Sequence, residues 1–190
     1  MGKKGVDAEN CRNFKGTAPL AVTYPVTDLL LHCRQAGVKN VVAMSHGIGN
    51  GLTEGLSRMG RGFEEWIVEP YDRNVLGSYA QSALDAMLKR FRGNTENLPE
   101  LFVFTDDHQA RGGLIAMATL GISVPGDVRV VTLANKGDVP AFPLSLTRIE
   151  VDPVKWGMLA AQCVRSYLDE GRLPDNVFAE GVYIKGETFA

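Results

Sequence analysis

The chain has 190 residues, a formal net charge of -2 and 45% hydrophobic side chains. This length suits one domain, or one domain with a large appendage, that buries about 70% of its unfolded surface. The near-neutral charge gives no basic field for nucleic acid or an anionic membrane, and no apolar run approaches the roughly 20 residues of a membrane helix. We therefore expect neither membrane insertion nor binding of duplex DNA by this chain.

The N-terminal segment and the cysteines bear on the cellular compartment. The sequence MGKKGVDAENCRNF carries positive charges with no apolar core behind them, so it does not resemble a secretory signal. Cys11, Cys33 and Cys163 are isolated thiols without CxxC spacing, which indicates a reducing cytoplasm and no metal site. Residues 1–20 are polar and punctuated by glycine, and we expect a linker or a poorly ordered remnant there.

Four short apolar runs predict strands, and the stretches between them are long enough for a helix each. The runs lie at 40–44, 66–68, 101–105 and 128–133. Those that read VVAM and LFVF are apolar throughout, which is typical of strands covered on both faces. The alternation predicts an α/β fold with an open, mainly parallel sheet and helices on both faces.

Apolar side chains at helical spacing, together with helix start and stop signals, predict the connecting helices. Gly37 and Gly121 can take the left-handed conformation that closes a helix, and Pro153 suits a first helical turn. The last run, at 177–184, alternates apolar and polar residues enough to predict a strand. The predicted helices are 26–36, 74–92, 108–120 and 153–169.

The most specific motifs lie between residues 101 and 152. The strand LFVFT ends in Asp106-Asp107, and Ala110 and Gly112 follow at a characteristic spacing. GISVPGDVRVV then contains a helix end, a Val-Pro turn and a buried strand, and LTRIEVD is a strand followed by a polar residue that opens a helix. In this order the motifs resemble the C-terminal lobe of the effector-binding core of lactose-repressor-type (LacI/GalR) transcriptional regulators, a periplasmic-binding-protein-like type I fold. The resemblance covers roughly residues 22–190.

This resemblance implies a domain organisation. Residues 21–190 would form the C-terminal lobe, and residues 152–190 would include a returning segment that packs on an N-terminal lobe. In the family a helix-turn-helix domain and that N-terminal lobe come first, and this sequence contains neither, so we interpret it as a fragment.

The resemblance also implies a function. The chain would be a non-enzymatic, cytoplasmic sensor of a small-molecule effector, a sugar or sugar derivative, with no cofactor. The full-length protein would be a homodimer that binds operator DNA, whereas this fragment, which lacks the DNA-binding domain, would not bind DNA.

Two aspartates are the leading candidates for effector binding, because open parallel sheets bind ligands beyond the carboxyl ends of their strands. Asp106 matches a ligand-binding position of the family, and a carboxylate there accepts charge-assisted hydrogen bonds from hydroxyl groups. Asp107 is either a second ligand contact or the N-cap of the helix that begins at His108.

The resemblance adds three weaker candidates. Many family members have an aspartate that grips sugar hydroxyls where Ala134 stands, and Asn135 beside it offers an amide or is a plain turn residue. The family commonly has an arginine at the position of Met59. Arg58 and Arg61 are the nearest basic side chains, and an exposed helix arginine is the alternative reading of each.

Two other functions remain open. A periplasmic sugar-binding protein of a transporter shares the fold. An NAD-binding enzyme is a weaker alternative. In its favour, SHGIGNGL has Gly47 and Gly49 in a GxG, and Glu69 follows the next strand. Against it, Leu52 stands where the motif has a third small residue, and no hydride-transfer site follows. The sequence lacks a GxSxG elbow, a P-loop and paired metal-binding histidines, so no catalytic residue is predicted.

Overall fold

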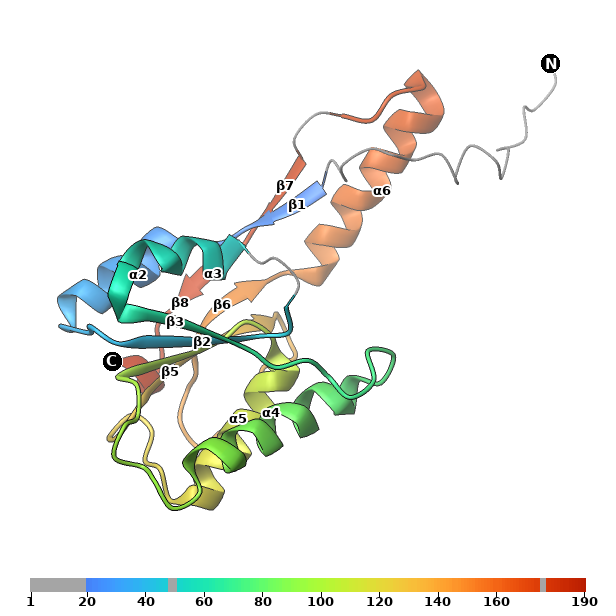
Figure 1. The fold of residues 1–190 in the computed structure, drawn as a ribbon. Helices are drawn as coiled ribbons and strands as arrows, with labels where there is room; N and C mark the ends of the chain where they lie inside the picture. The colour runs from blue at the N-terminus through green and yellow to red at the C-terminus, as the bar shows by residue number, and fades with distance from the viewer. Residues whose placement is uncertain (1–19, 48–50, 175–176) are drawn as a thin grey trace. The chain divides into compact units, whose positions relative to one another are not determined.

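The computed structural model describes residues 20–47, 51–174 and 177–190 (Figure 1). The chain divides into two units. The larger unit comprises residues 22–153 and 180–190, and the smaller unit includes residues 154–179. Residues 1–19, and with them most of the expected linker, lie outside the described residues.

The larger unit contains a six-stranded sheet in the order β3-β2-β4-β5-β6-β8. Its first five strands are parallel and β8 is antiparallel to β6. The mainly parallel sheet predicted from the sequence is therefore confirmed. The strands are β2 (Val41–Ser45), β3 (Phe63–Ile67), β4 (Leu101–Phe104), β5 (Arg129–Asn135), β6 (Thr147–Val151) and β8 (Val182–Ile184).

Helices cover both faces of this sheet, as expected. The first face packs against α4 and α5, and the second against α2 and α3. All four helices predicted from the sequence are present, with bounds that shift by no more than a turn. The helical elements of the larger unit are α2 (Val26–Gln35), α3 (Gly51–Leu56), the 3-10 helix η1 (Ser57–Gly62), α4 (Leu76–Phe91), α5 (Asp107–Leu120) and the 3-10 helix η2 (Glu187–Phe189).

The central strand β4 shows why these segments fold together. Phe102 and Phe104 point to the first face and Leu101 and Val103 to the second, and all four side chains are fully buried. On the first face, Gly112 allows α5 to approach α4 closely, because a Cβ there would overlap the carbonyl group of Ala80.

The last residues of the chain complete the second face. Phe189 is fully buried, and its ring stacks on His32 of α2 with 4.0 Å between ring centroids. His32 Nδ1 also lies 2.7 Å from the hydroxyl oxygen of Tyr183. Beside them, Thr188 Oγ1 donates a hydrogen bond of 2.8 Å to the carbonyl of Val130. The C-terminal segment is thus part of the core.

The predicted strand at 177–184 is instead two strands in two sheets. β7 (Val177–Glu180) pairs with β1 (Leu20–Thr23), and β8 joins the six-stranded sheet. The change occurs at Gly181, whose N–H donates to the carbonyl of Thr23 at 2.8 Å. A Cβ at Gly181 would lie 3.3 Å from that same carbonyl oxygen, so glycine suits the close approach.

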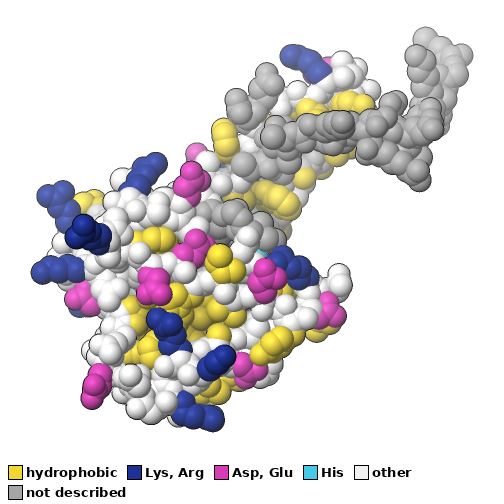
Figure 2. All heavy atoms as spheres, viewed as in Figure 1, with side chains coloured by type: hydrophobic (Ala, Val, Ile, Leu, Met, Phe, Trp, Pro, Cys, Tyr) yellow, Lys and Arg dark blue, Asp and Glu magenta, His cyan; other side chains and the backbone are white. Residues whose placement is uncertain are grey.

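The smaller unit is dominated by α6 (Pro153–Glu170). Hydrophobic side chains are visible along this helix (yellow in Figure 2), and Val154, Met158, Val164 and Leu168 are all more than half exposed. Cys163 is buried. Apolar side chains therefore lie on more than one side of α6. Among the described residues, no helix combines the length and apolarity needed to cross a bilayer.

Candidate functional site

Parallel strands bring their carboxyl ends to one edge of the sheet, which we call the carboxyl edge. It comprises the ends of β2, β3, β4 and β5 with the residues that follow them, at 45–47, 67–69, 105–109 and 135–138. Thr105 N–H donates to the Met44 carbonyl at 3.0 Å, which holds the ends of β2 and β4 side by side.

Asp106 is the N-cap of α5. Its Oδ1 accepts a hydrogen bond from the backbone N–H of Gln109 at 3.0 Å, and its backbone is extended, with φ -150° and ψ 135°. The alternative in which Asp107 caps the helix is therefore wrong, because Asp107 is already the first helical residue. The cap fixes one carboxylate oxygen of Asp106 and leaves Oδ2 without a hydrogen bond from the described residues.

Asp107 is buried, with 7% of its surface exposed. Its Oδ1 accepts from the N–H of His108 at 3.1 Å, but its Oδ2 has no hydrogen-bond partner. His108 Nε2 lies 4.0 Å from Oδ1, which is too far for a hydrogen bond. Burial, and next the negative charge of Asp106, raise the pKa of Asp107 above its ordinary value.

Buried side-chain atoms without a hydrogen-bond partner gather at the carboxyl edge. Within the described ranges there are four such atoms: His46 Nδ1, Thr105 Oγ1, Asp107 Oδ2 and Gln109 Oε1. A buried polar atom left unpaired costs about 1–3 kcal/mol, so natural proteins keep few of them. They lie directly after β2 and β4 and in the first turn of α5, and this concentration marks the carboxyl edge as suited to a hydrogen-bonding ligand.

Neighbouring groups hold two of these side chains in place. Gln109 Nε2 donates to the Val68 carbonyl at 2.9 Å, and the His46 ring packs edge-on against Tyr79 at 5.6 Å between centroids. Sequence reasoning missed His46, Thr105 and Gln109 as site residues. Only their place directly after two buried strands could have indicated them.

The weaker candidates are separated from one another. Asn135 lies at the carboxyl edge as the exposed last residue of β5, and Ala134 before it is buried. Arg58 and Arg61 lie in η1, which leads into the start of β3 at the opposite edge of the sheet. The structure does not bring these two arginines together with Asp106.

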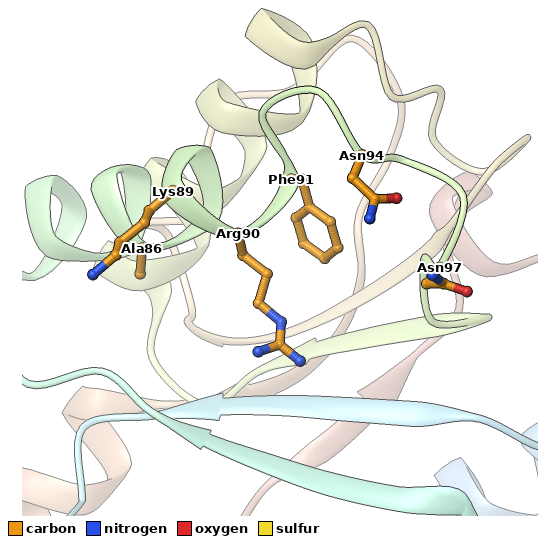
Figure 3. Close-up of a pocket in the computed structure, with 6 residues that line it drawn as sticks. All are labelled: Ala86, Lys89, Arg90, Phe91, Asn94 and Asn97. Atoms are coloured by element: carbon orange, nitrogen blue, oxygen red, sulfur yellow. The ribbon is translucent and has the colours of Figure 1, made fainter.

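A cavity of about 560 Å³ also lies away from the carboxyl edge, at the C-terminal end of α4 (Figure 3). Asn94 and Asn97 line one side of it, and Arg90 reaches from the helix toward the strands. The Arg90 guanidinium lies 4.4 Å from the Trp66 ring centroid and 3.7 Å from Glu64 Oε1. Its charge is therefore already paired within the protein.

The described ranges contain no group of three His, Cys, Asp or Glu side chains that could hold a metal ion. Glu69, which would hold the ribose in an NAD-binding enzyme, is instead paired with Arg73 at 3.1 Å. In the GxG of that alternative, Gly47 is described, whereas Ile48 and Gly49 lie outside the described residues.

A comparison with protein families matches residues 30–189 to the periplasmic binding protein-like domain. The chain belongs to this family. A search of curated protein sequences found no match.

Solved structures with this periplasmic binding protein-like fold include LacI-family transcriptional regulators. One from Sanguibacter keddieii DSM 10542, described as putative, has a TM-score of 0.69 at 18% identity, over 92% of this chain and 70% of that one. One from Arthrobacter sp. FB24, in complex with lactose, has a TM-score of 0.66 at 14% identity, over 90% and 65%. One from Bifidobacterium animalis subsp. lactis DSM 10140 has a TM-score of 0.66 at 21% identity, over 87% and 60%. At these identities the likeness is one of fold, and this chain spans 60–70% of the length of these regulators.

Proposed function

We propose that this chain is the effector-sensing part of a LacI-type transcriptional regulator, and that its carboxyl edge contacts a small molecule, a sugar or sugar derivative. The observation that carries the proposal is the group of four buried, unpaired polar atoms at that edge. Hydroxyl groups of a carbohydrate can donate to such acceptors and accept from such donors. The regulator bound to lactose provides a precedent on a similar fold.

The proposed mechanism is a shift between conformations. In the complete regulator the effector binds between this lobe and a second one, and it favours whichever arrangement of lobes it contacts better. That preference changes how a dimer presents its DNA-binding domains to operator DNA. In this proposal the chain acts in the cytoplasm as a sensor of the effector and not as an enzyme.

A groove on the larger unit supports self-association. It has a volume of about 440 Å³, is lined by Ile115 and Ala118 of α5 and by Phe142 and Pro143 of the loop after β5, and Ile115 is 55% exposed. An exposed apolar groove of this kind suits a protein interface. Light scattering on Ile115→Asp tests the homodimer: the dimeric mass should fall to that of a monomer, and an unchanged mass contradicts this surface.

The function is tested by calorimetry on this chain and on the two-lobed protein, after mass spectrometry identifies the small molecule that the two-lobed protein carries. A two-lobed cleft divides its hydrogen bonds between lobes, so loss of two or three contacts of about 1.5 kcal/mol each should weaken binding by a factor of about 100 or more. Equal affinities for the two proteins would place the whole site in this lobe.

The alternative, a transport binding protein, predicts a different partner. A gel shift with the full-length protein and its upstream DNA distinguishes the two. Effector-dependent DNA binding supports a regulator, and its absence supports the transport protein. This chain alone should not shift duplex DNA at physiological salt, because its net charge of -2 supplies few phosphate contacts.

A further inference from the structure

We propose that the effector presents a positively charged group, a protonated amine, to the Asp106–Asp107 pair. This inference rests on the proposed function and specifies the chemistry of its ligand. It depends on two features of the carboxyl edge: two adjacent carboxylates with unused oxygens, and neighbouring cations that are paired with other acids.

The two carboxylates have acceptor capacity that the protein does not use. Asp106 Oδ1 is engaged by the helix cap, and Asp107 Oδ1 by the N–H of His108. Asp107 Oδ2 has no hydrogen-bond partner among the described residues, in a side chain that is more than nine-tenths buried. An acceptor in this state gains most from a donor that the ligand brings.

The nearby cations offset the charge of this pair only in part, because His108 and Arg111 lower the pKa of Asp107 by less than its burial and Asp106 raise it. Two basic side chains that follow strand ends, Arg73 and Lys136, and Arg111 within α5 are each paired with an acid other than Asp106 and Asp107. These ion pairs are Arg73–Glu69 at 3.1 Å, Arg111–Asp138 at 2.7 Å and Lys136–Asp152 at 3.0 Å. Asp106 and Asp107 therefore leave an excess of negative charge at the carboxyl edge.

An ammonium group fits this arrangement better than a hydroxyl group does. It has three donors and no acceptor, which matches carboxylate oxygens, and charge-assisted hydrogen bonds are roughly twice as strong as neutral ones. A cation would also offset both causes of the raised pKa of Asp107, its burial and the charge of Asp106.

The test is an NMR titration of the ¹⁵N-labelled chain with two matched pairs, D-glucosamine against D-glucose and D-galactosamine against D-galactose. At about pH 6.5 the amines are protonated. The backbone amides of residues 105–109 report binding at the carboxyl edge. We expect at least one amino sugar to bind about fivefold more tightly than its parent sugar. That preference should shrink in about 0.5 M salt, which screens charge.

Charge-removing variants test the assignment to residues. Asp106→Asn and Asp107→Asn keep the shape of the side chain, and each should bring the affinity ratio of the matched pair close to one. Glu96→Gln, an exposed carboxylate in the loop after α4, should leave it unchanged. The salt dependence of the unmodified chain serves as the test if a variant fails to fold.

The outcomes separate this inference from the proposed function. Equal binding of amino sugar and parent sugar at these amides overturns the amine inference and leaves carbohydrate sensing intact. If none of the four compounds shifts these amides at up to about 100 mM, the amine inference is overturned, and the proposed function is decided by the calorimetry on the two-lobed protein. An amine preference that persists in both aspartate variants overturns the assignment to this pair.

Discussion

Replacing Asp106 with alanine should lower the free energy of unfolding of the larger unit by about 1 kcal/mol. The lost contact is the 3.0 Å hydrogen bond from the N–H of Gln109 to Asp106 Oδ1, and removal of an aspartate N-cap typically costs this amount. Loss of a negative charge at the helix N-terminus adds a few tenths of a kcal/mol, and relief of the repulsion from Asp107 offsets part of that. In a chain of this size the melting temperature should fall by about 2–4 °C.

The assay is urea unfolding followed by tryptophan fluorescence. Trp66 lies in the larger unit and Trp156 in the smaller one, so a Trp156→Phe background makes the signal specific to the larger unit. Asp106→Asn should stay within a few tenths of a kcal/mol of the unmodified chain, because asparagine caps helices as well as aspartate does. The reasoning fails if the alanine variant is as stable as the unmodified chain, or if asparagine destabilises as much as alanine.

Three further predictions concern the core and the site. Phe189→Ala should cost about 3–5 kcal/mol in urea unfolding, whereas Phe178→Ala, at a half-exposed ring, should cost under about 1 kcal/mol; similar values would show that the tail is not part of the core. Because the pKa of Asp107 is raised by folding, its protonated form favours the native state, and stability is lost as pH rises through its folded-state pKa. Asp107→Asn removes that dependence. In parallel melts, the stability of the variant relative to the unmodified chain should therefore improve as pH rises from acid to neutral. A difference in stability that does not change with pH contradicts the burial argument. Gly112→Ala should destabilise the chain in thermal melts by more than about 1 kcal/mol, since the new Cβ overlaps the Ala80 carbonyl, and an unchanged melting temperature would disprove close contact of α4 and α5.

Sequence patterns predict the sheet because its central strands are apolar on both faces. The runs VVAM and LFVF are apolar on both faces, which is typical of strands between two helical layers, so the sequence predicts β2 and β4. The short elements β1 and α3, of four and six residues, carry too few periodic positions to be recognised. The division of 177–184 at Gly181 depends on which strand each half meets, which a local pattern does not contain.

The site is less predictable, because it also depends on tertiary contacts that a local sequence pattern does not contain. Two consecutive aspartates before a helix are equally good caps by residue type, and only the backbone geometry selects Asp106. The unpaired atoms of Thr105 and Gln109 are a property of tertiary burial. Arg58 is one residue from a family arginine position in the sequence, but it lies in η1 at the opposite edge of the sheet.

The position of Phe189 has a consequence for biosynthesis. Residues 22–153 leave the ribosome well before residues 180–190, yet the larger unit needs both. Until residues 180–190 have emerged, the face of the sheet beside α2 lacks the Phe189 ring, and β6 lacks β8 along its outer side. The nascent chain therefore carries an incomplete core and an open strand edge, the features that chaperones bind and that promote aggregation. A message truncated between codons 181 and 189 should yield a protein that is degraded, even though every residue of the carboxyl edge is present.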